Sequence, residues 1–337
     1  MKAFVVGAGA VGGRVARTVV DSPACHEVVI VEQDHSRAEL AVRTLGPSAR
    51  MASGVGPEVL RDMAPGDVVI LAHPDEHAPW AEVALQSGGH AVSVSNAEED
   101  VRALLALDAP AQRAGCHLVV GAGFSPGLSC VLALHAASIY DQVEEIHVAR
   151  VGTGGPGCAQ LHHRLLHGRS LDWRDGQWVR AQAGTGRELC WFPDPVGGRD
   201  CYRAQLPDAL LLVPALPGLR RVTSRLAATR RDRITRLFPM MRNPHPEGLV
   251  GAIRIEVRGR RGRVRDVTVY GAYDRPALAA GVVAAVAGLW ASAPKAGQAL
   301  DGPGAGGLAQ KLSDPSGFLA ELALRGVRAA TFVGGDQ

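Results

Sequence analysis

Three glycines near the start of the chain have the spacing of a nucleotide-binding turn. Gly7, Gly9 and Gly12 form the pattern G-x-G-x-x-G directly after a short apolar run, with Ala10 and Val11 between the last two. In such a turn the first glycine allows the tight bend, the second lets the backbone approach a pyrophosphate, and the third lets the next helix pack on the strand. The N-terminus of that helix offers free N–H groups to the phosphates. We therefore expect these five residues to bind a dinucleotide.

A carboxylate follows the second apolar run at the distance expected of a ribose ligand. Glu32 lies 20 residues after Gly12, and Gln33 follows it. A glutamate here accepts hydrogen bonds from the adenosine ribose and repels a 2′-phosphate, which favours NAD over NADP. Arg37 lies five residues after Glu32, where it either meets such a phosphate or lies on a helix surface. Glu32 and Gln33 are predicted cofactor contacts, and NADP stays open as the alternative.

Three later apolar runs also end in polar or glycine-rich segments. They cover residues 68–72, 91–95 and 117–120. Strands that alternate with helix-like segments at this pitch predict a parallel, doubly wound α/β sheet of the Rossmann type, whose ligand lies at the carboxyl ends of the strands. Simple turn chemistry is the alternative interpretation of each segment. The predicted cofactor contacts at these ends are Ala72, His73, Pro74, Ser95, Gly123, Phe124, Pro126 and Gly127.

The pattern changes after about residue 140. Residues 143–151 indicate a strand of a different sheet, and residues 219–237 indicate an arginine-dense helix. Segments 250–258 and 263–272 alternate apolar and polar residues on either side of a short glycine-bounded turn, which predicts an antiparallel hairpin. We therefore expect a mixed α+β domain in the middle of the chain.

The composition fits a protein with two globular domains. The chain has 337 residues, 47% of them hydrophobic, and a net charge of +3; two domains are the natural expectation at this length. No apolar run approaches the length of about 18 residues that a membrane span needs, and no secretory signal is visible, so we expect a cytoplasmic protein without a membrane partner. The six cysteines form no C-x-x-C pair, so neither a zinc ribbon nor a thioredoxin motif is expected.

The second glycine segment carries a resemblance to a known family. Residues 119–129, VVGAGFSPGLS, resemble the G-x-x-P-G segment of the saccharopine dehydrogenase-like family. The segment 111–115 before it is similar too, as are the apolar helix 276–291, the segment 313–319 and the segment 324–327. The resemblance covers about residues 1–140 and 265–330. Residues 150–250 do not match a member of known activity.

The resemblance implies a Rossmann domain formed by both ends of the chain, with an inserted α+β domain that carries a mixed or antiparallel sheet. The corresponding boundaries are 1–128 for the dinucleotide-binding domain, 129–274 for the substrate and dimerisation domain, and 275–337 for C-terminal helices that return to the first domain. The family implies a homodimeric NAD(P)-dependent oxidoreductase acting on a C–N bond, by imine reduction or secondary amine oxidation of an amino-acid-derived substrate. The alternative is a non-catalytic NAD(P)-binding sensor or scaffold.

Imine reduction requires a proton for the nitrogen, which a histidine or a carboxylic acid can manage. His162 and His163 lie in the densest histidine cluster, with His167 one helical turn after His163. A zinc site lacks an evident third ligand, so no metal is expected, and a solvated helix face is the other alternative. Asp200 lies in a glycine-rich segment suited to a lid or substrate wall, or to a surface loop. These three residues are the catalytic candidates.

A carboxylate-bearing small molecule is the expected substrate, and arginines are the side chains that grip carboxylates with paired hydrogen bonds. The arginine-dense stretch contains Arg230 and Arg231. A solvated helix explains it as well, and nucleic-acid binding is not expected because acids are interspersed and no nucleic-acid motif is present. The substrate-binding candidates are Arg150, Tyr202, Arg230 and Arg231.

Overall fold

The first sheet is parallel throughout. The computed structural model describes residues 1–235, 245–246, 248–294 and 299–332. Its strand order is β15-β6-β5-β4-β1-β2-β3, with β1 at a crossover position between β4 and β2. The strands are β1 (Lys2–Val6), β2 (Glu27–Val31), β3 (Ala49–Met51), β4 (Val68–Leu71), β5 (His90–Ser93), β6 (His117–Val120) and β15 (Gly304–Gly307). The predicted doubly wound sheet is confirmed, and β15 shows that the C-terminal part of the chain completes it.

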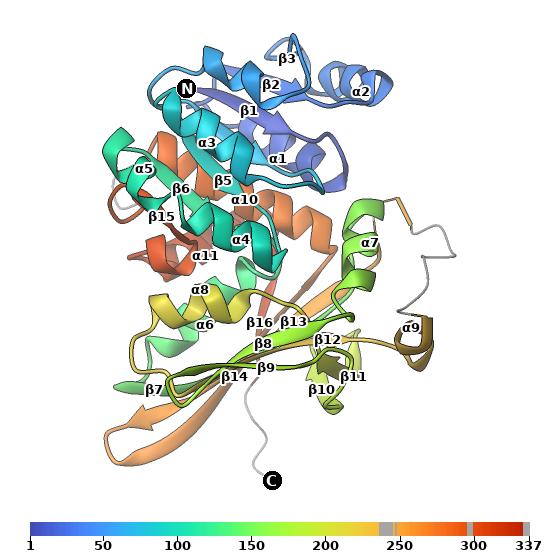
Figure 1. Ribbon diagram of the computed structural model, residues 1–337, viewed down its shortest axis with the longest axis vertical. Helices are drawn as coiled ribbons and strands as arrows, with labels where there is room; N and C mark the ends of the chain where they lie inside the picture. The colour runs from blue at the N-terminus through green and yellow to red at the C-terminus, as the bar shows by residue number, and fades with distance from the viewer. Residues whose placement is uncertain (236–244, 247, 295–298, 333–337) are drawn as a thin grey trace.

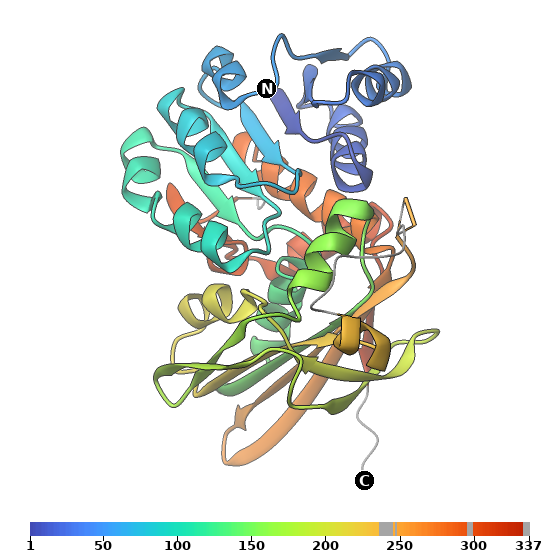
Figure 2. The ribbon, with the colours of Figure 1, turned by 45° about the vertical axis from the view of Figure 1, so that its right-hand side comes forward.

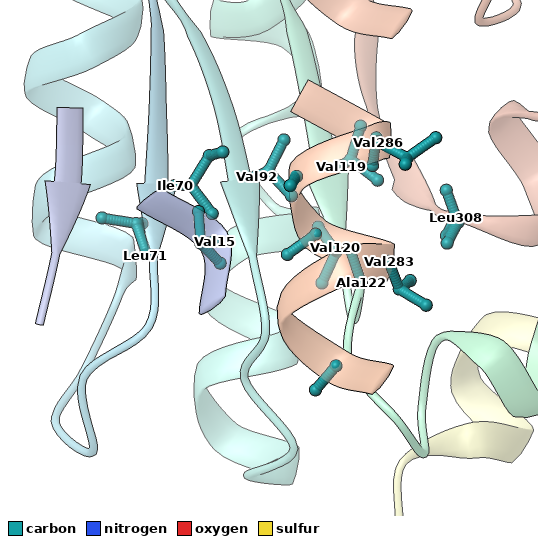
Figure 3. Packing of buried hydrophobic residues seen from close by; sticks show 14 of the residues in the cluster. Val15, Ile70, Leu71, Val92, Val119, Val120, Ala122, Val283, Val286 and Leu308 are labelled. Atoms are coloured by element: carbon teal, nitrogen blue, oxygen red, sulfur yellow. The ribbon is translucent and has the colours of Figure 1, made fainter. Parts of the chain in front are cut away.

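Helices cover both faces of this sheet (Figure 1). On one face α1 packs against α10, and α10 also crosses β4 and β5; on the other face α3 packs against α4 and α5. These helices are α1 (Ala10–Val20), α2 (His35–Leu45), η1 (Pro57–Asp62), α3 (Ala78–Gln86), α4 (Glu98–Leu105), α5 (Asp108–Ala114) and α10 (Pro276–Ser292). Figure 3 shows Val283 and Val286 of α10 on the side of Val119 and Leu308, within the same buried cluster. The all-apolar strands are therefore buried on both sides, as a parallel sheet requires.

The second sheet is mixed and forms a separate layer (Figure 2). Its order is β10-β11-β12-β7-β13-β14-β16, with β8 pairing β12 and β9, and β7 runs parallel to β12. The strands are β7 (Gln142–Val151), β8 (Arg169–Arg174), β9 (Gln177–Gln182), β10 (Glu188–Phe192), β11 (Gly197–Arg203), β12 (Arg221–Ala227), β13 (Gly251–Arg261), β14 (Val264–Asp274) and β16 (Ala329–Phe332). The hairpin of β13 and β14 confirms the predicted one.

The remaining helices lie between the sheets or at their junction. They are α6 (Leu128–Ala137), α7 (Pro156–Arg164), α8 (Asp208–Ala215), α9 (Arg230–Thr235), η2 (Ala309–Lys311) and α11 (Pro315–Leu324). α6 packs on β13 and β14, α8 packs on β8 and β12, and α11 packs on α6 and α10. The predicted return of C-terminal helices to the first domain is confirmed by α10 and by α11, whose N-cap Asp314 accepts a hydrogen bond from the N–H of Gly317.

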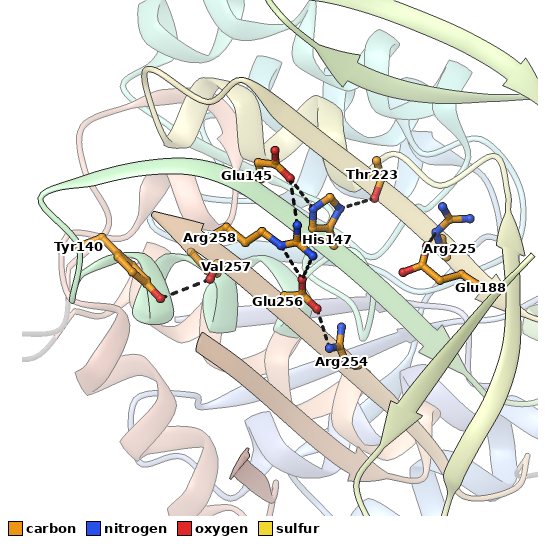
Figure 4. Close-up of polar contacts among 10 residues, drawn as sticks. All are labelled: Tyr140, Glu145, His147, Glu188, Thr223, Arg225, Arg254, Glu256, Val257 and Arg258. Atoms are coloured by element: carbon orange, nitrogen blue, oxygen red, sulfur yellow. Dashed lines mark hydrogen bonds and ion pairs between the residues drawn. The ribbon is translucent and has the colours of Figure 1, made fainter. Parts of the chain in front are cut away.

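The face of the second sheet opposite α6 and α8 carries paired charges (Figure 4). The two nitrogens of His147 on β7 lie 2.8 Å from Thr223 Oγ1 and 3.0 Å from Glu145 Oε2. Arg258 Nη2 lies 2.6 Å from Glu256 Oε1 on β13. Alternate residues of β7 and β13, among them Ile146 and Ile255, are buried in the core instead. This period-2 alternation assigns one face of the sheet to the helices and the other to polar contacts.

The expectation of one helix over residues 219–237 was wrong. Residues 221–227, expected within a helix, form β12 at the centre of the second sheet, because Val222, Ser224 and Leu226 alternate toward the core. The helix in this stretch is confined to α9, and residues 236–237 lie outside the described residues. Residues 98–114 form two consecutive helices, α4 and α5. Pro110 lacks an N–H and is tolerated in the first turn of a helix, so the helix restarts before it.

The crossing of α1 and α10 predicts opposite effects for two glycine-to-alanine changes. A Cβ at Gly281 of α10 would lie 2.7 Å from Arg14 Cβ and 2.8 Å from the Val11 carbonyl oxygen, whereas a Cβ at Gly13 of α1 meets nothing within 4 Å. We expect Gly281→Ala to lower the free energy of unfolding by about 1–3 kcal/mol through overpacking. Gly13→Ala is expected to raise it by up to about 1 kcal/mol through helix propensity. Urea unfolding measures both, and equal stability of the two variants would contradict the close crossing.

Candidate nucleotide-binding and active site

The first glycine loop is tight at both ends and open in the middle. Gly7 has φ +94°, and its N–H donates to the carbonyl of Val31 at 2.8 Å. A Cβ at Gly12 would lie 1.7 Å from the Gly7 carbonyl oxygen, but a Cβ at Gly9 meets nothing within 4 Å. α1 begins at Ala10, and its N-cap Gly9 offers no side chain to the first N–H groups. The loop therefore has the free donors and the open backbone approach that a pyrophosphate needs.

Glu32 is held beside this loop at the end of β2. Its Oε2 accepts a hydrogen bond from the N–H of Ala8 at 2.8 Å, and its Oε1 accepts one from Asp34 at 3.1 Å. Arg37 Nη1 lies 3.4 Å from the same carboxylate and pairs with Asp34 as well. A carboxylate has about four acceptor positions and these three donors occupy three of them, so Glu32 keeps one position for a ribose hydroxyl. Gln33 follows it in an exposed position.

The ends of β4 and β5 adjoin the loop. The carbonyl oxygen of Ala72 would lie 2.9 Å from a Cβ at Gly7, and Pro74 reaches the second domain, where its Cβ would lie 3.5 Å from a Cβ at Gly157. The ring of His73 packs against neighbouring aromatic rings of α3, and burial lowers the pKa of His73 to about 3. The N–H of Ser95 donates to Ser93 Oγ at 3.1 Å.

The second glycine loop folds back on itself. The N–H of Gly123 donates to the carbonyl of Pro126 at 2.9 Å, Gly127 has φ +129°, and a Cβ at Gly127 would lie 2.1 Å from the Gly123 carbonyl oxygen. Phe124 is buried within the loop. Gly127 is also the N-cap of α6. The N–H groups of Leu128 and Ser129 donate to the carbonyls of Gly123 and Phe124 at 2.9 and 3.2 Å, so the loop itself caps this helix start.

The two loops meet the second domain at a narrow cavity of about 70 Å³. Its lining includes Val11 from α1, Gly123, Phe124 and Pro126 from the second glycine loop, Ala277 and Ala280 from α10, and Arg150, Thr153, Cys158 and His162 from the second domain. Figures 1 and 2 show α7, which carries Cys158 and His162, standing at the junction of the two domains. The cavity is therefore the place where a group bound at the rim would meet side chains of the inserted domain.

Two lining side chains carry unsatisfied polar atoms. Arg150 is 7% exposed, and its Nη1 donates to the carbonyl of Ser125 at 2.6 Å. Within the described part of the chain, Arg150 Nε and His162 Nδ1 are buried without a hydrogen-bond partner. Burial and the positive charge of Arg150 lower the pKa of His162 to about 3. Since buried polar groups are almost always paired in native proteins, these atoms indicate a place for a polar ligand.

A buried aspartate that the sequence did not single out supports the second glycine loop. Asp208 begins α8 and is fully buried. Its Oδ1 accepts hydrogen bonds from Ser125 Oγ at 3.0 Å and from Ser129 Oγ at 2.7 Å. Burial raises the pKa of Asp208, and the charge of Arg150 opposes that rise. In the sequence this aspartate follows a proline ahead of an apolar run, which indicates an ordinary helix start, so no local signal marks it.

The other catalytic and substrate-binding candidates lie elsewhere in the second domain. None of them is among the described residues that line the cavity. The ring of His163 lies 5.9 Å from that of His167, and Asp200 on β11 pairs with Arg187 at 2.9 Å. Tyr202 is buried in the cluster of Leu165 and Leu226. Arg230 and Arg231 are exposed on α9. Among the described residues, no group of three His, Cys, Asp or Glu side chains is placed to hold a metal ion.

Sequence comparison gives distant relatives only in part of the chain. No protein-family model matches the chain. The carboxynorspermidine synthase of Vibrio cholerae serotype O1 is 26% identical over 200 residues, which are 52% of this chain and 46% of that protein. The chain therefore spans about half the length of the curated relative that it matches.

Comparison of structures gives whole-chain matches. Saccharopine dehydrogenase (L-Glu forming) from Saccharomyces cerevisiae superposes with a TM-score of 0.70 at 12% identity, over 98% of this chain and 100% of that chain. The chain has the fold of this saccharopine dehydrogenase. DAP dehydrogenase of C. glutamicum, in complex with DAP, gives 0.52 at 14% identity over 97% and 99% of the two chains. An amine dehydrogenase from Mycobacterium smegmatis gives 0.53 at 12% over 93% and 96%. The resemblance inferred from the two glycine segments is confirmed at the level of the fold.

No helix among the described residues is long and apolar enough to span a bilayer.

Replacing His162 by glutamine is expected to flatten the dependence of stability on pH below 6.5. The fold lowers the pKa of His162 from 6.5 to about 3, so the unfolded chain takes up the proton first as the pH falls. For each unit by which the pH falls below 6.5, His162 therefore lowers the free energy of unfolding by up to about 1.4 kcal/mol, until the pH reaches the lowered pKa. Urea unfolding at about pH 7 and about pH 5 measures the slope. His35→Gln on α2, whose side chain is 74% exposed, is the control, and a slope in His162→Gln equal to that of the unaltered chain would contradict the shift.

Proposed function

We propose that this chain is an NAD(P)-dependent oxidoreductase that acts on a C–N bond of an amino-acid-derived, carboxylate-bearing substrate. The observation that supports it best is the junction itself, where two glycine loops meet side chains of the second domain. The first loop leads into a helix start without a side-chain cap, and the buried Arg150 and the half-buried His162 each carry one buried polar atom without a partner among the described residues. A dehydrogenase needs this combination, because the dinucleotide and the substrate must share one water-poor site. The similar proteins include a saccharopine dehydrogenase, a DAP dehydrogenase and an amine dehydrogenase, whose names are consistent with this chemistry.

The residues present fit a dinucleotide. The N–H groups at the start of α1 and the open space at Gly9 suit the pyrophosphate, and Glu32 suits the adenosine ribose. The ends of β4 and β5, with His73 and Ser95, lie at the same edge of the sheet. The bound dinucleotide would supply or accept the hydride. Glu32 favours NAD, although Arg37 lies 3.4 Å from its carboxylate and NADP remains the alternative.

Arg150 and His162 take the substrate in this proposal. A substrate carboxylate bound to Arg150 satisfies a buried guanidinium with charge-assisted hydrogen bonds. It also offsets the positive charge of Arg150, which is the second cause after burial of the lowered pKa of His162, so that this pKa is higher with substrate bound than without it. The imidazole can then hold the proton that the substrate nitrogen takes up when the C=N bond is reduced, and it accepts that proton in the reverse direction.

A non-catalytic NAD(P)-binding sensor is the second candidate. The cavity of about 70 Å³ favours it, because this space is small for an amino-acid-derived substrate beside a nicotinamide. A homodimer stays a prediction from the family resemblance, and sedimentation velocity tests it.

The first test replaces the glycine at the open position of the loop. We expect Gly9→Val to weaken NADH and NADPH binding by about 100-fold, since its side chain fills the pyrophosphate approach. Its stability should stay within about 0.5 kcal/mol of the unaltered chain, because a Cβ there meets nothing within 4 Å. Gly12→Ala, whose Cβ would meet the Gly7 carbonyl at 1.7 Å, should lose both stability and binding. Fluorescence titration and urea unfolding separate the two, and full affinity in Gly9→Val would refute a dinucleotide at this loop.

The second test concerns the substrate. Oxidation of NADH or NADPH is measured with a panel of amines paired with 2-oxo acids. For any pair that reacts, Arg150→Met should raise the KM for the carboxylate-bearing partner by about 30-fold or more without changing the affinity for NADH. Arg254→Met is the matched control, because Arg254 is a half-buried arginine on the opposite face of the second sheet, 2.6 Å from Glu256. Tight dinucleotide binding without turnover across the panel would favour the sensor instead.

A further inference from the structure

A buried histidine connects the ends of two neighbouring strands at the rim. His77 is the N-cap of α3 and is 1% exposed. Its Nε2 lies 3.0 Å from the carbonyl oxygen of His73, after β4, and its Nδ1 lies 2.7 Å from Ser93 Oγ, at the end of β5. Its ring also packs on the ring of His73, with centroids 4.4 Å apart. Neither the nucleotide-binding residues nor the substrate residues proposed above include it.

The partners of His77 determine its tautomer. A carbonyl oxygen only accepts, so Nε2 must carry the hydrogen and donate to His73. In the neutral ring Nδ1 is then the acceptor, and the Ser93 hydroxyl donates to it. Burial lowers the pKa of His77, which agrees with a neutral ring, although the nearby carboxylates of Asp75 and Asp100 oppose the shift.

The chain of hydrogen bonds continues on both sides of His77. Ser93 Oγ, having donated its hydrogen to the imidazole, accepts the N–H of Ser95 at 3.1 Å. Asp100 Oδ1, from α4, accepts the N–H of His77 at 2.9 Å and that of Ala78 at 3.1 Å. The backbone after β4, the backbone after β5 and the start of α3 are therefore joined through one side chain. Every donor and acceptor of the imidazole is used.

We propose that His77 is a positioning residue for the dinucleotide, fixing the spacing between the strand ends at His73 and Ser95 across which the dinucleotide lies. This inference rests on the proposed function, since it requires a dinucleotide at the carboxyl edge of the first sheet. The physical reason is pre-organisation: a loop already held in its binding geometry loses less freedom when the ligand arrives. His77 touches neither nicotinamide nor substrate in this role and acts through the two loops.

Three substitutions separate the two connections. Asparagine places an amide oxygen near the position of Nδ1, so His77→Asn keeps the acceptor for Ser93 and loses the donor to His73. Glutamine places an amide nitrogen near the position of Nε2, so His77→Gln keeps the donor and loses the acceptor. His77→Phe fills the space and loses both. Ser93→Ala removes the acceptor of Ser95 together with the Ser93 link, and should resemble His77→Gln.

The Kd for NADH and for NADPH is measured by fluorescence titration of the full chain. We expect an increase of about 10-fold or more in His77→Phe, and about 3-fold in each of the variants that keeps one connection, since each lost hydrogen bond weakens binding by a few-fold. A second measurement is the ¹⁵N spectrum of the histidine ring, which distinguishes protonated from unprotonated nitrogens. It should show an Nε2–H tautomer for His77, and its resonances should shift when the dinucleotide is added.

A histidine at the other end of β5 provides the matched control. His90 Nδ1 accepts the N–H of His117 at 3.0 Å, at the amino ends of β5 and β6. His90→Phe should reduce stability without changing the Kd. If the Kd of His77→Phe equals that of the unaltered chain, the role of His77 alone is overturned. If His77→Phe does not fold, an unchanged Kd in His77→Asn and His77→Gln overturns it instead. If the unaltered chain binds neither NADH nor NADPH, the proposed function itself fails.

Discussion

The burial of the Arg150 guanidinium is the constraint on which the junction of the two domains depends. Taking an arginine out of water costs several kcal/mol unless hydrogen bonds and an opposite charge compensate it. The compensation here comes from the other domain and from the layer between the sheets: the Ser125 carbonyl accepts from Nη1, and the charge of Asp208 raises the pKa of Arg150 against the effect of burial. Because Arg150 lies on β7 and Ser125 on the second glycine loop, the charge ties the inserted domain to the nucleotide-binding domain.

The same constraint organises the loop itself. Asp208 cannot be buried as a carboxylate without donors, and both of its hydrogen bonds come from serines that flank the loop, Ser125 and Ser129. One oxygen receives both, and among the described residues the other is left without a partner. The cluster therefore leaves one carboxylate oxygen of Asp208 and the Nε of Arg150 buried without a hydrogen bond, and the Nε is the atom that the proposed substrate carboxylate would satisfy.

The parts of the fold and the site that the sequence predicts are those fixed by contacts between residues close together in the chain. Gly7 is required by its positive φ and Gly12 by its close contact with the Gly7 carbonyl; both requirements lie within one turn, so the pattern alone predicts the loop. Arg150 and His162 were candidates because their residue types suit the chemistry, but nothing in the sequence brought them together, and His163 and Asp200 had the same claim. Asp208 and His77 carry no local signal, since their partners lie 83 and 16 residues away along the chain. The arginine-dense stretch was taken for a helix because long basic side chains suit the surface of a helix and of a strand alike.

The two domains are also joined by contacts outside the cavity, and these contacts differ in how far solvent reaches them. Arg180 of β9 reaches across to Glu98 at the start of α4, with Nη1 3.1 Å from Oε2, but its side chain is 41% exposed. Glu98 itself is 7% exposed and Arg180 also reaches its Oε1, so solvent and salt weaken this ion pair only through Arg180. The buried contacts of Arg150 and the close approach of α7 to Pro74 also join the two domains. The relative position of the domains therefore rests on the charges and backbone groups that line the site, so that whatever binds Arg150 also acts on the junction between the domains.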